Sequence, residues 1–164
     1  EDSGILEKAR MFELKSHFVP RDKLDSLDYD KKISAILDAY EVNLIALIGY
    51  MRLFGSEFVN KYKNRIMNIH PSLLPSFLGM DLNVHQAVLD YGCKVSGCTL
   101  FFVDEGKDTG PIILQRTIQV YPGDNAFSLK SRVQLVEQEV YIQGIRLYSL
   151  GKLNIDGRKV IIEQ

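Results

Sequence analysis

An uninterrupted apolar run, Leu44 to Ile48, constrains the fold of this 164-residue chain more than any other feature. The run has the length of a strand and ends at Gly49. A strand without polar residues is typical of a central parallel strand that is covered on both faces. Helices on both sides of a sheet supply that cover, so the run predicts an α/β fold.

The sequence around this run alternates between helical and strand patterns. Helical spacing of apolar residues and short apolar runs that end at proline mark the successive elements. We expect helices over residues 5–14, 30–41 and 57–62, and strands over residues 17–19 and 65–69. This order predicts a sheet that is at least partly parallel.

The second half of the chain follows a different pattern. We expect a helix over residues 82–91, β-rich runs over 95–103 and 112–120, a long helix over about 126–150, and a closing hairpin of residues 153–155 and 159–162. A turn-rich loop joins the two β-rich runs, which favours antiparallel pairing. The expected fold is therefore α/β in one domain, residues 1–164: a three-layer open, mostly parallel sheet with an antiparallel C-terminal part and a long C-terminal helix.

Composition excludes several classes of protein. The 20 Lys and Arg residues nearly balance the 21 Asp and Glu residues, which argues against binding to nucleic acid or to a membrane surface by bulk charge. No apolar stretch reaches the ~18 residues that a membrane helix needs. Cys93 and Cys98 are too few for a disulfide scaffold and make a poor zinc signal. We expect two reduced thiols in a cytoplasmic protein, and no metal.

The stretch Asn68 to Gly79 contains the first candidate for chemistry. Asn68 and His70 lie two residues apart on an expected strand, so their side chains share a face. An amide beside an imidazole is able to hold a carbonyl oxygen and to supply a proton to it. A histidine whose hydrogen bonds are simply satisfied at a strand end explains the same pair.

Two further segments follow expected strands. The loop Asp104 to Pro111 contains three acidic residues, which suit a cation site, a solvated turn, or a carboxylate that orients His70. The segment Gly49 to Leu53 follows the apolar run, at a place that suits a flat ligand ring against exposed backbone, or a plain strand exit. In α/β sheets, ligands bind beyond the carboxyl ends of the strands.

Together, the three segments resemble the folate-dependent formyltransferase family. The matched motifs are Gly-Tyr-Met-Arg-Leu, Asn-Ile-His-Pro-Ser-Leu-Leu-Pro-Ser-Phe-x-Gly and Asp-Glu-Gly-x-Asp-Thr-Gly-Pro-Ile-Ile, in the family's order. The resemblance runs from Gly4 to about Leu153, and it implies a Rossmann-like sheet. It also implies a cis peptide bond between Leu74 and Pro75. The match is best with the branch that formylates glycinamide ribonucleotide in purine biosynthesis.

The resemblance implies a role for each matched residue. His70 would be the catalytic acid–base, Asn68 would hold the formyl oxygen, and Asp108 would pair with His70 and order a water. The donor, 10-formyltetrahydrofolate, would bind Met51, Arg52, Leu53, Phe54, Asn68, Val103, Asp104, Glu105, Gly106, Lys107 and Asp108. The ribonucleotide would contact Gln134, Leu135, Val136 and Glu137, of which Glu137 is the stronger candidate.

The sequence departs from the family at its start. The family begins with a strand, a Gly-Ser-Asn phosphate loop, a helix and a second strand, and we expect that unit to be absent here. Its absence would leave an open slot in the sheet and would remove the loop that cradles the substrate phosphate.

Other functions of the same fold stay open. Formyltetrahydrofolate deformylase usually has Asn-Ile-His-His in place of Asn-Ile-His-Pro, and methionyl-tRNA formyltransferase usually has Arg-Gly-Ala-Ala-Pro after Leu-Leu-Pro. A non-catalytic folate-binding protein is the third alternative. The expected partners are small molecules, namely glycinamide ribonucleotide and folate, without nucleic acid or membrane, and the expected assembly is a monomer or a homodimer.

Overall fold

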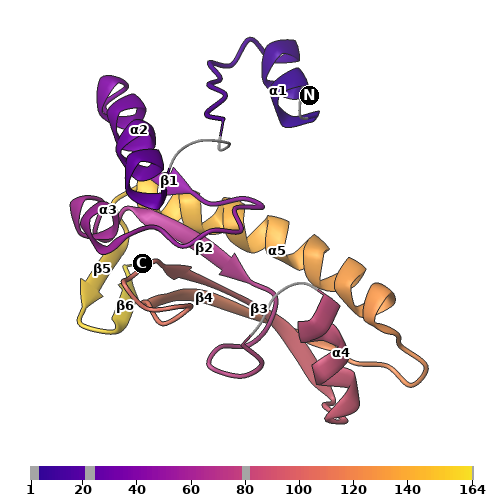
Figure 1. Ribbon diagram of the computed structural model, residues 1–164. Coiled ribbons are helices and arrows are strands. Elements are labelled where there is room, and N and C mark those ends of the chain that lie inside the picture. The colour runs from indigo at the N-terminus through magenta and orange to yellow at the C-terminus, as the bar shows by residue number, and fades with distance from the viewer. Residues whose placement is uncertain (1–3, 21–24, 79–81, 164) are drawn as a thin grey trace. The chain divides into compact units, whose positions relative to one another are not determined.

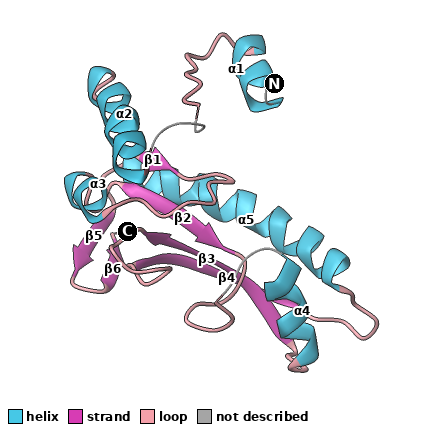
Figure 2. Cartoon of the chain, viewed as in Figure 1, coloured by secondary structure: helices cyan, strands magenta, loops and turns pink. Residues whose placement is uncertain are grey.

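The computed structural model describes residues 4–20, 25–78 and 82–163. The chain forms two compact units, residues 1–42 and residues 43–164. Figure 1 follows the chain by residue number, and Figure 2 separates its helices from its strands. All strands of the described residues belong to the larger unit.

The smaller unit contains two helices. α1 spans Gly4–Met11, and α2 spans Ser26–Ala39. α2 begins earlier than the expected residue 30 because Asp25 caps its N-terminus. The Asp25 carboxylate accepts a hydrogen bond from the Asp28 amide at 2.8 Å, and this satisfies one of the amides that the first helical turn leaves unpaired.

The strand expected at residues 17–19 is wrong. The backbone of these residues is irregular, and the His17 ring nitrogen Nε2 lies 2.9 Å from the Tyr40 hydroxyl. A strand requires ladder hydrogen bonds to a neighbour. Among the described residues, the strands all lie within 45–162, and residues 17–19 form none.

The larger unit contains one six-stranded sheet in the order β1-β2-β3-β4-β6-β5. The strands are β1 (Ile45–Ala46), β2 (Ile66–His70), β3 (Val95–Phe102), β4 (Ile112–Gln119), β5 (Leu153–Asp156) and β6 (Lys159–Ile162). The α/β class and the antiparallel C-terminal part are confirmed. The sheet is mixed rather than mostly parallel, because only the β1–β2 and β4–β6 pairings are parallel.

The apolar run that predicted a central strand lies at the edge of the described sheet. β1 includes only Ile45 and Ala46, and it pairs with β2 alone. Leu47 continues the pairing with one further hydrogen bond, from its amide to the Met67 carbonyl at 2.9 Å. An apolar run reports a tendency to be buried and contains no information about which strands lie beside it, so the expectation of a central strand is wrong here.

Three further helices complete the larger unit: α3 (Ser56–Lys61), α4 (Leu82–Asp90) and α5 (Ala126–Ser149). All three match the sequence expectation within a few residues at each end. α5 lies along the sheet and packs on β3, β4 and α4 (Figure 2). Its N-terminus has a capping box, in which the Asn125 side chain accepts from the Ser128 amide and the Ser128 hydroxyl accepts from the Asn125 amide.

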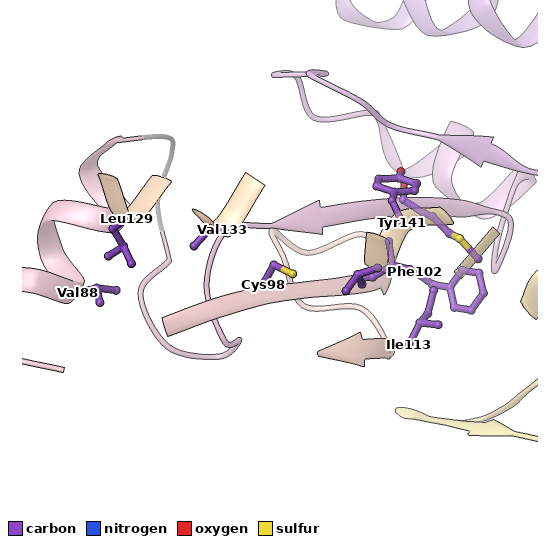
Figure 3. Packing of buried hydrophobic residues seen from close by; sticks show 10 residues of the cluster. Val88, Cys98, Phe102, Ile113, Leu129, Val133 and Tyr141 are labelled. Carbon is purple, nitrogen blue, oxygen red and sulfur yellow. The ribbon is translucent and has the colours of Figure 1, made fainter. Parts of the chain in front are cut away.

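The hydrophobic core fills the space between α5, α4 and the sheet. Figure 3 shows how side chains from the two sides meet there. The buried cluster consists of Met67, Val88, Cys98, Leu100, Phe102, Ile113, Leu129, Val133, Val140 and Tyr141. The Tyr141 hydroxyl lies 2.7 Å from the Met67 carbonyl and 3.1 Å from the Leu47 carbonyl, so it joins α5 to β2 and to the residue that follows β1.

Candidate functional site

β2 places the first two candidate residues. Asn68 and His70 lie two positions apart on the strand, so their side chains leave the sheet on the same face. His70 is the last residue of β2 and is only 4% exposed, whereas Asn68 is half-buried. A buried imidazole must find partners for its nitrogens within the protein.

One partner of the His70 ring is a backbone carbonyl. The ring nitrogen Nε2 lies 3.1 Å from the carbonyl oxygen of Phe77. Because a carbonyl only accepts hydrogen bonds, Nε2 carries the proton in the neutral ring. Phe77 has a φ of 54°, in the left-handed region that bulky residues rarely adopt. This turn therefore directs its carbonyl at the imidazole.

A buried threonine holds the loop that contains Phe77. Thr99 lies opposite His70 on β3 and is fully buried. Its hydroxyl donates to the Ser72 carbonyl at 2.7 Å and accepts from the Leu74 amide at 3.0 Å. The loop also contains the cis peptide bond between Leu74 and Pro75, as expected.

The other nitrogen of His70 faces a carboxylate. Nδ1 lies 3.6 Å from Oδ2 of Asp108, and the Asp108 side chain is 14% exposed. This separation is an ion-pair distance rather than a hydrogen bond. Asp108 has a φ of 56°, a left-handed conformation that Asp tolerates better than most residues. The doubly protonated ring satisfies Asp108 and Phe77 at once.

Asp108 reaches His70 from an unexpected direction. β3 is antiparallel to β2, and the Val103 amide donates to the Ile66 carbonyl at 2.9 Å. Loop 103–111 therefore starts beside the first residue of β2, about 13 Å along the strand from His70. It has to fold back over the sheet to bring Asp108 to the ring. The rule that ligand sites lie beyond the carboxyl ends of parallel strands does not account for this approach.

Local hydrogen bonds shape this loop. Oδ1 of Asp104 accepts from the Gly106 amide at 3.1 Å and from the Thr109 hydroxyl at 2.6 Å. The Asn60 side chain of α3 donates to Oε1 of Glu105 at 2.6 Å. These contacts show that the loop is more than a solvated turn.

The segment expected to bind the donor lies between β1 and α3. Met51 and Leu53 are exposed, and the Phe54 ring stacks between Tyr50 and Phe58, at centroid distances of 4.6 and 4.0 Å. Because β1 and β2 are parallel, this segment begins at the carboxyl ends of these two strands, where His70 also lies. Exposed apolar side chains at these strand ends are available to a flat ligand.

The segment expected to contact the ribonucleotide lies on α5. Gln134 and Leu135 are exposed, and Val136 and Glu137 are half-buried. Burial raises the pKa of the Glu137 carboxyl above its ordinary value. In the described parts of the chain, we find no contact between these four residues and the His70–Asp108 pair.

A cysteine thiol and a metal site are the other reactive groups to consider. Burial raises the pKa of the Cys98 thiol to about 12, so the thiol stays protonated and unreactive. Within residues 4–20, 25–78 and 82–163, no three His, Cys, Asp or Glu side chains gather in a way that would hold a metal ion. None of the helices in these ranges is long and apolar enough to cross a membrane.

Sequence reasoning missed the groups that position His70 and Asp108. The Phe77 carbonyl is part of the backbone, so no side-chain pattern points to it. Thr99 is a polar residue in a β-rich run that also contains Ser96, and its full burial, which makes its hydroxyl need partners, is seen only in the structure.

The fold and the site define a class of protein. A mixed α/β sheet presents a buried imidazole that is held between a carboxylate and a backbone carbonyl, with an amide on the same strand face. Such an arrangement is able to hold a carbonyl oxygen and to exchange a proton with it, as acyl-type transfer by acid–base catalysis requires. Residues 2–145 match the family described as formyl transferase. The chain belongs to the formyl transferase family.

Individual relatives agree with this assignment. The chain is 40% identical over 156 residues to the phosphoribosylglycinamide formyltransferase of Bacillus subtilis, which covers 94% of this chain and 78% of that protein. It is 39% identical over 127 residues to the trifunctional purine biosynthetic protein adenosine-3 of Bos taurus, which covers 77% of this chain. This chain spans about an eighth (12%) of the length of that trifunctional protein.

A solved structure shows the same fold. The crystal structure of glycinamide ribonucleotide transformylase 1 from Symbiobacterium toebii superposes with a TM-score of 0.92 at 40% sequence identity. The superposition covers 100% of this chain and 77% of that chain. The similarity therefore includes the sheet, the long C-terminal helix and the loops around His70.

Proposed function

We propose that this protein transfers the formyl group of 10-formyltetrahydrofolate to the amine of glycinamide ribonucleotide. Family membership and the names of the relatives support a formyl transfer. The observation that carries the proposal is the environment of His70, whose Nδ1 lies 3.6 Å from Asp108 while Nε2 is engaged by the Phe77 carbonyl. A ring held in this way has one nitrogen available for proton exchange with a bound substrate.

The proposed reaction is a direct transfer. The amine nitrogen attacks the formyl carbon, a new C–N bond forms, and negative charge grows on the formyl oxygen. The bond from the formyl carbon to the folate nitrogen N10 then breaks. The amine loses one proton and N10 gains one, so atoms and charge balance without a covalent enzyme intermediate.

Each candidate residue has a task in this reaction. The Asn68 amide donates a hydrogen bond to the formyl oxygen, and a donor of this kind contributes roughly 3–4 kcal/mol to the transition state. Protonated His70 stabilises the same charge and exchanges protons through Nδ1. Asp108, 3.6 Å from Nδ1, would lie opposite the positive charge of the ring when the ring carries both protons.

The remaining candidates form the proposed binding surfaces. Backbone groups and side chains of residues 51–54 and 103–108 would hold the folate, consistent with the exposed apolar side chains of Met51 and Leu53. Residues 134–137 would contact the ribonucleotide. The half-buried Glu137 suits hydroxyl groups of a ribose, because a carboxylate accepts hydrogen bonds from them.

The test follows the release of tetrahydrofolate spectroscopically. The full chain is incubated with 10-formyltetrahydrofolate, with and without glycinamide ribonucleotide. Release that needs the ribonucleotide supports the proposal. Release at the same rate without it identifies water as the acceptor, which makes the protein a deformylase and overturns the proposed acceptor. No release in either arm overturns formyl transfer by this chain. The same assay on a chain that also carries the family's strand and Gly-Ser-Asn phosphate loop then separates an enzyme that needs that unit from a non-catalytic folate-binding protein.

Variants then test the site itself. His70→Ala and Asp108→Asn are each expected to lower kcat by about 10²–10⁴-fold, because general acid–base groups contribute on that scale. His17→Ala, an exposed histidine of the smaller unit, is the matched control and should keep full activity. Wild-type turnover in both site variants would show that the catalytic residues lie elsewhere.

A further inference from the structure

The C-terminal hairpin reaches the loop that contains Asp108. β5 and β6 are joined by a tight turn, in which Asp156 pairs with Lys159 and Gly157 has a φ of 56°. Arg158 follows this glycine, and its Nη1 donates to the carbonyl oxygen of Thr109 at 2.5 Å. The two residues are 49 positions apart in sequence. Thr109 is the residue directly after Asp108.

The sheet fixes the place of this hairpin. β6 pairs with β4 in parallel through Lys159 and Ile112, so Arg158 lies beside the end of loop 103–111. The loop is tightly packed there, because a Cβ on Gly110 would lie 1.7 Å from the Phe102 carbonyl. Arg158 therefore contacts the peptide group between Thr109 and Gly110, and Gly110 is packed closely against the Phe102 carbonyl.

The conformation of Asp108 gives this contact its importance. Asp108 lies in the left-handed region, which residues other than glycine rarely adopt, so surrounding contacts have to maintain it. The Asp104 carboxylate accepts hydrogen bonds from the Gly106 amide and from the Thr109 hydroxyl, on either side of Asp108. Arg158 adds a charged donor at the Thr109 carbonyl, in an exposed position where solvent weakens the bond.

We propose that Arg158 is a positioning residue, which holds the Asp108 carboxylate toward His70 through the Thr109 carbonyl. Its effect on turnover rests on the proposed function, but its effect on the geometry does not. Arg158 does not touch the reacting atoms. Its loss should weaken the step that uses Asp108, while binding of the ribonucleotide, which is proposed to contact residues 134–137, should stay intact.

The kinetic test compares Arg158→Met with Lys159→Met. The control removes the charge of the next residue, whose side chain the structure does not place on the loop. Arg158→Met is expected to lower kcat about three- to tenfold, the range expected for the loss of one solvent-exposed hydrogen bond, with KM for the ribonucleotide within about twofold. Arg158→Lys should recover part of the loss, since it keeps a charged donor. An unchanged kcat in Arg158→Met overturns the proposal.

A double-mutant cycle separates positioning from general destabilisation. If Arg158 acts through Asp108, then Arg158→Met costs nothing further in an Asp108→Asn background. An equal loss of kcat in both backgrounds would show that the arginine acts on something else. Urea unfolding of each variant identifies any loss of overall stability.

A second readout does not depend on activity. In the full-length protein with ¹⁵N-labelled histidine, Arg158→Met should shift the His70 Nδ1 resonance in the same direction as Asp108→Asn, and amide exchange at Asp108 and Thr109 should become faster. Unchanged resonance and exchange would overturn the positioning role. If these changes appear but the wild-type protein releases no tetrahydrofolate, the proposed function fails and the positioning role stands.

Discussion

The chemistry of His70 depends on which acceptor faces each nitrogen of its ring. The Phe77 carbonyl faces Nε2 at 3.1 Å, and the Asp108 carboxylate faces Nδ1 at 3.6 Å. Both partners accept hydrogen bonds, and the Phe77 carbonyl, which alone is within hydrogen-bond distance, decides the position of the proton in the neutral ring. Under the proposed function, Nδ1, beside Asp108, is the nitrogen that would exchange a proton with a substrate.

This assignment predicts the tautomer of one residue. In ¹⁵N NMR spectra of histidine-labelled protein, neutral His70 should carry its proton on Nε2, because the carbonyl has no proton to offer. The exposed His17 gives the reference signal in the same sample. A neutral His70 with its proton on Nδ1 would contradict the hydrogen bond to Phe77 and would leave Nε2 as the reactive nitrogen.

The sequence predicts reactive side chains better than the groups that orient them. His70 and Asp108 were identified through motif resemblance, and the structure brings them together. The Phe77 carbonyl and the guanidinium of Arg158 were not identified. One is a backbone atom, and the other acts at a residue 49 positions away, which only the pairing of β6 with β4 brings within reach.

At the scale of elements, an ion pair between Asp124 and Arg132 lies at the start of α5. The Asp124 carboxylate accepts from both terminal nitrogens of Arg132, one of them at 2.8 Å, and from the Ser128 hydroxyl at 2.8 Å. The Arg132 guanidinium also lies 4.9 Å above the Tyr121 ring. These hydrogen bonds, mainly that of Arg132, hold the pKa of the Asp124 carboxyl far below its ordinary value.

The shifted pKa predicts how stability depends on pH. Because the folded pKa of Asp124 is lower than the unfolded one, its contribution is present above about pH 4 and is lost as the pH falls toward the folded value. Asp124→Asn should lower the free energy of unfolding at pH 7 by about 1–2 kcal/mol, allowing for partial exposure of Arg132. Urea unfolding should show a smaller difference at pH 3 than at pH 7. Glu139→Gln, an exposed charge on the same helix, is the control. An equal difference at both pH values would contradict the linkage.

Gly144 allows α5 to approach the sheet closely. A Cβ at this position would lie 2.1 Å from Cδ2 of Leu100, which is fully buried. Glycine to alanine in a helix normally stabilises by about 1 kcal/mol, but displacing a packed core side chain costs about 1–3 kcal/mol. Gly144→Ala should therefore destabilise the protein by about 1 kcal/mol in urea unfolding.

Two further variants check that the cause is the contact with Leu100. Gln138→Ala, on the exposed side of α5, should change stability by less than about 0.5 kcal/mol. Adding Leu100→Val to Gly144→Ala removes atoms from the crowded side, so the double variant should be more stable than the sum of the two single effects. Strict additivity would show that the two side chains do not interact.

Whether a segment forms a helix or a strand was easier to predict than which segments lie beside it. Helical periodicity and caps identified all helices of the described residues, because these signals are local. The strand expected at 17–19 and the central place expected for residues 44–48 were wrong, because pairing depends on distant segments. The mixed sheet follows from the β3–β4 connection, since loop 103–111 is too short for a parallel crossover.

At the scale of the whole molecule, core and candidate site belong to the same unit. Every residue of the buried cluster lies between Met67 and Tyr141, and the partly buried residues packed against it extend from Leu44 to Val160. Asn68, His70, Asp108 and Arg158 also lie in residues 43–164. That residues 1–164 form one formyltransferase domain stays a prediction.

This arrangement predicts that residues 43–164 fold without the smaller unit. Each fully buried large apolar side chain of the cluster contributes about 1.5–3 kcal/mol, and a chain of this length is able to support its own core. The separate unit should unfold cooperatively in urea and should show dispersed methyl NMR signals. The full chain, measured under the same conditions, is the reference. Gradual unfolding with strong binding of a hydrophobic dye would instead show that the core is incomplete without residues 1–42, because fixed side-chain packing is what separates a native core from a collapsed one.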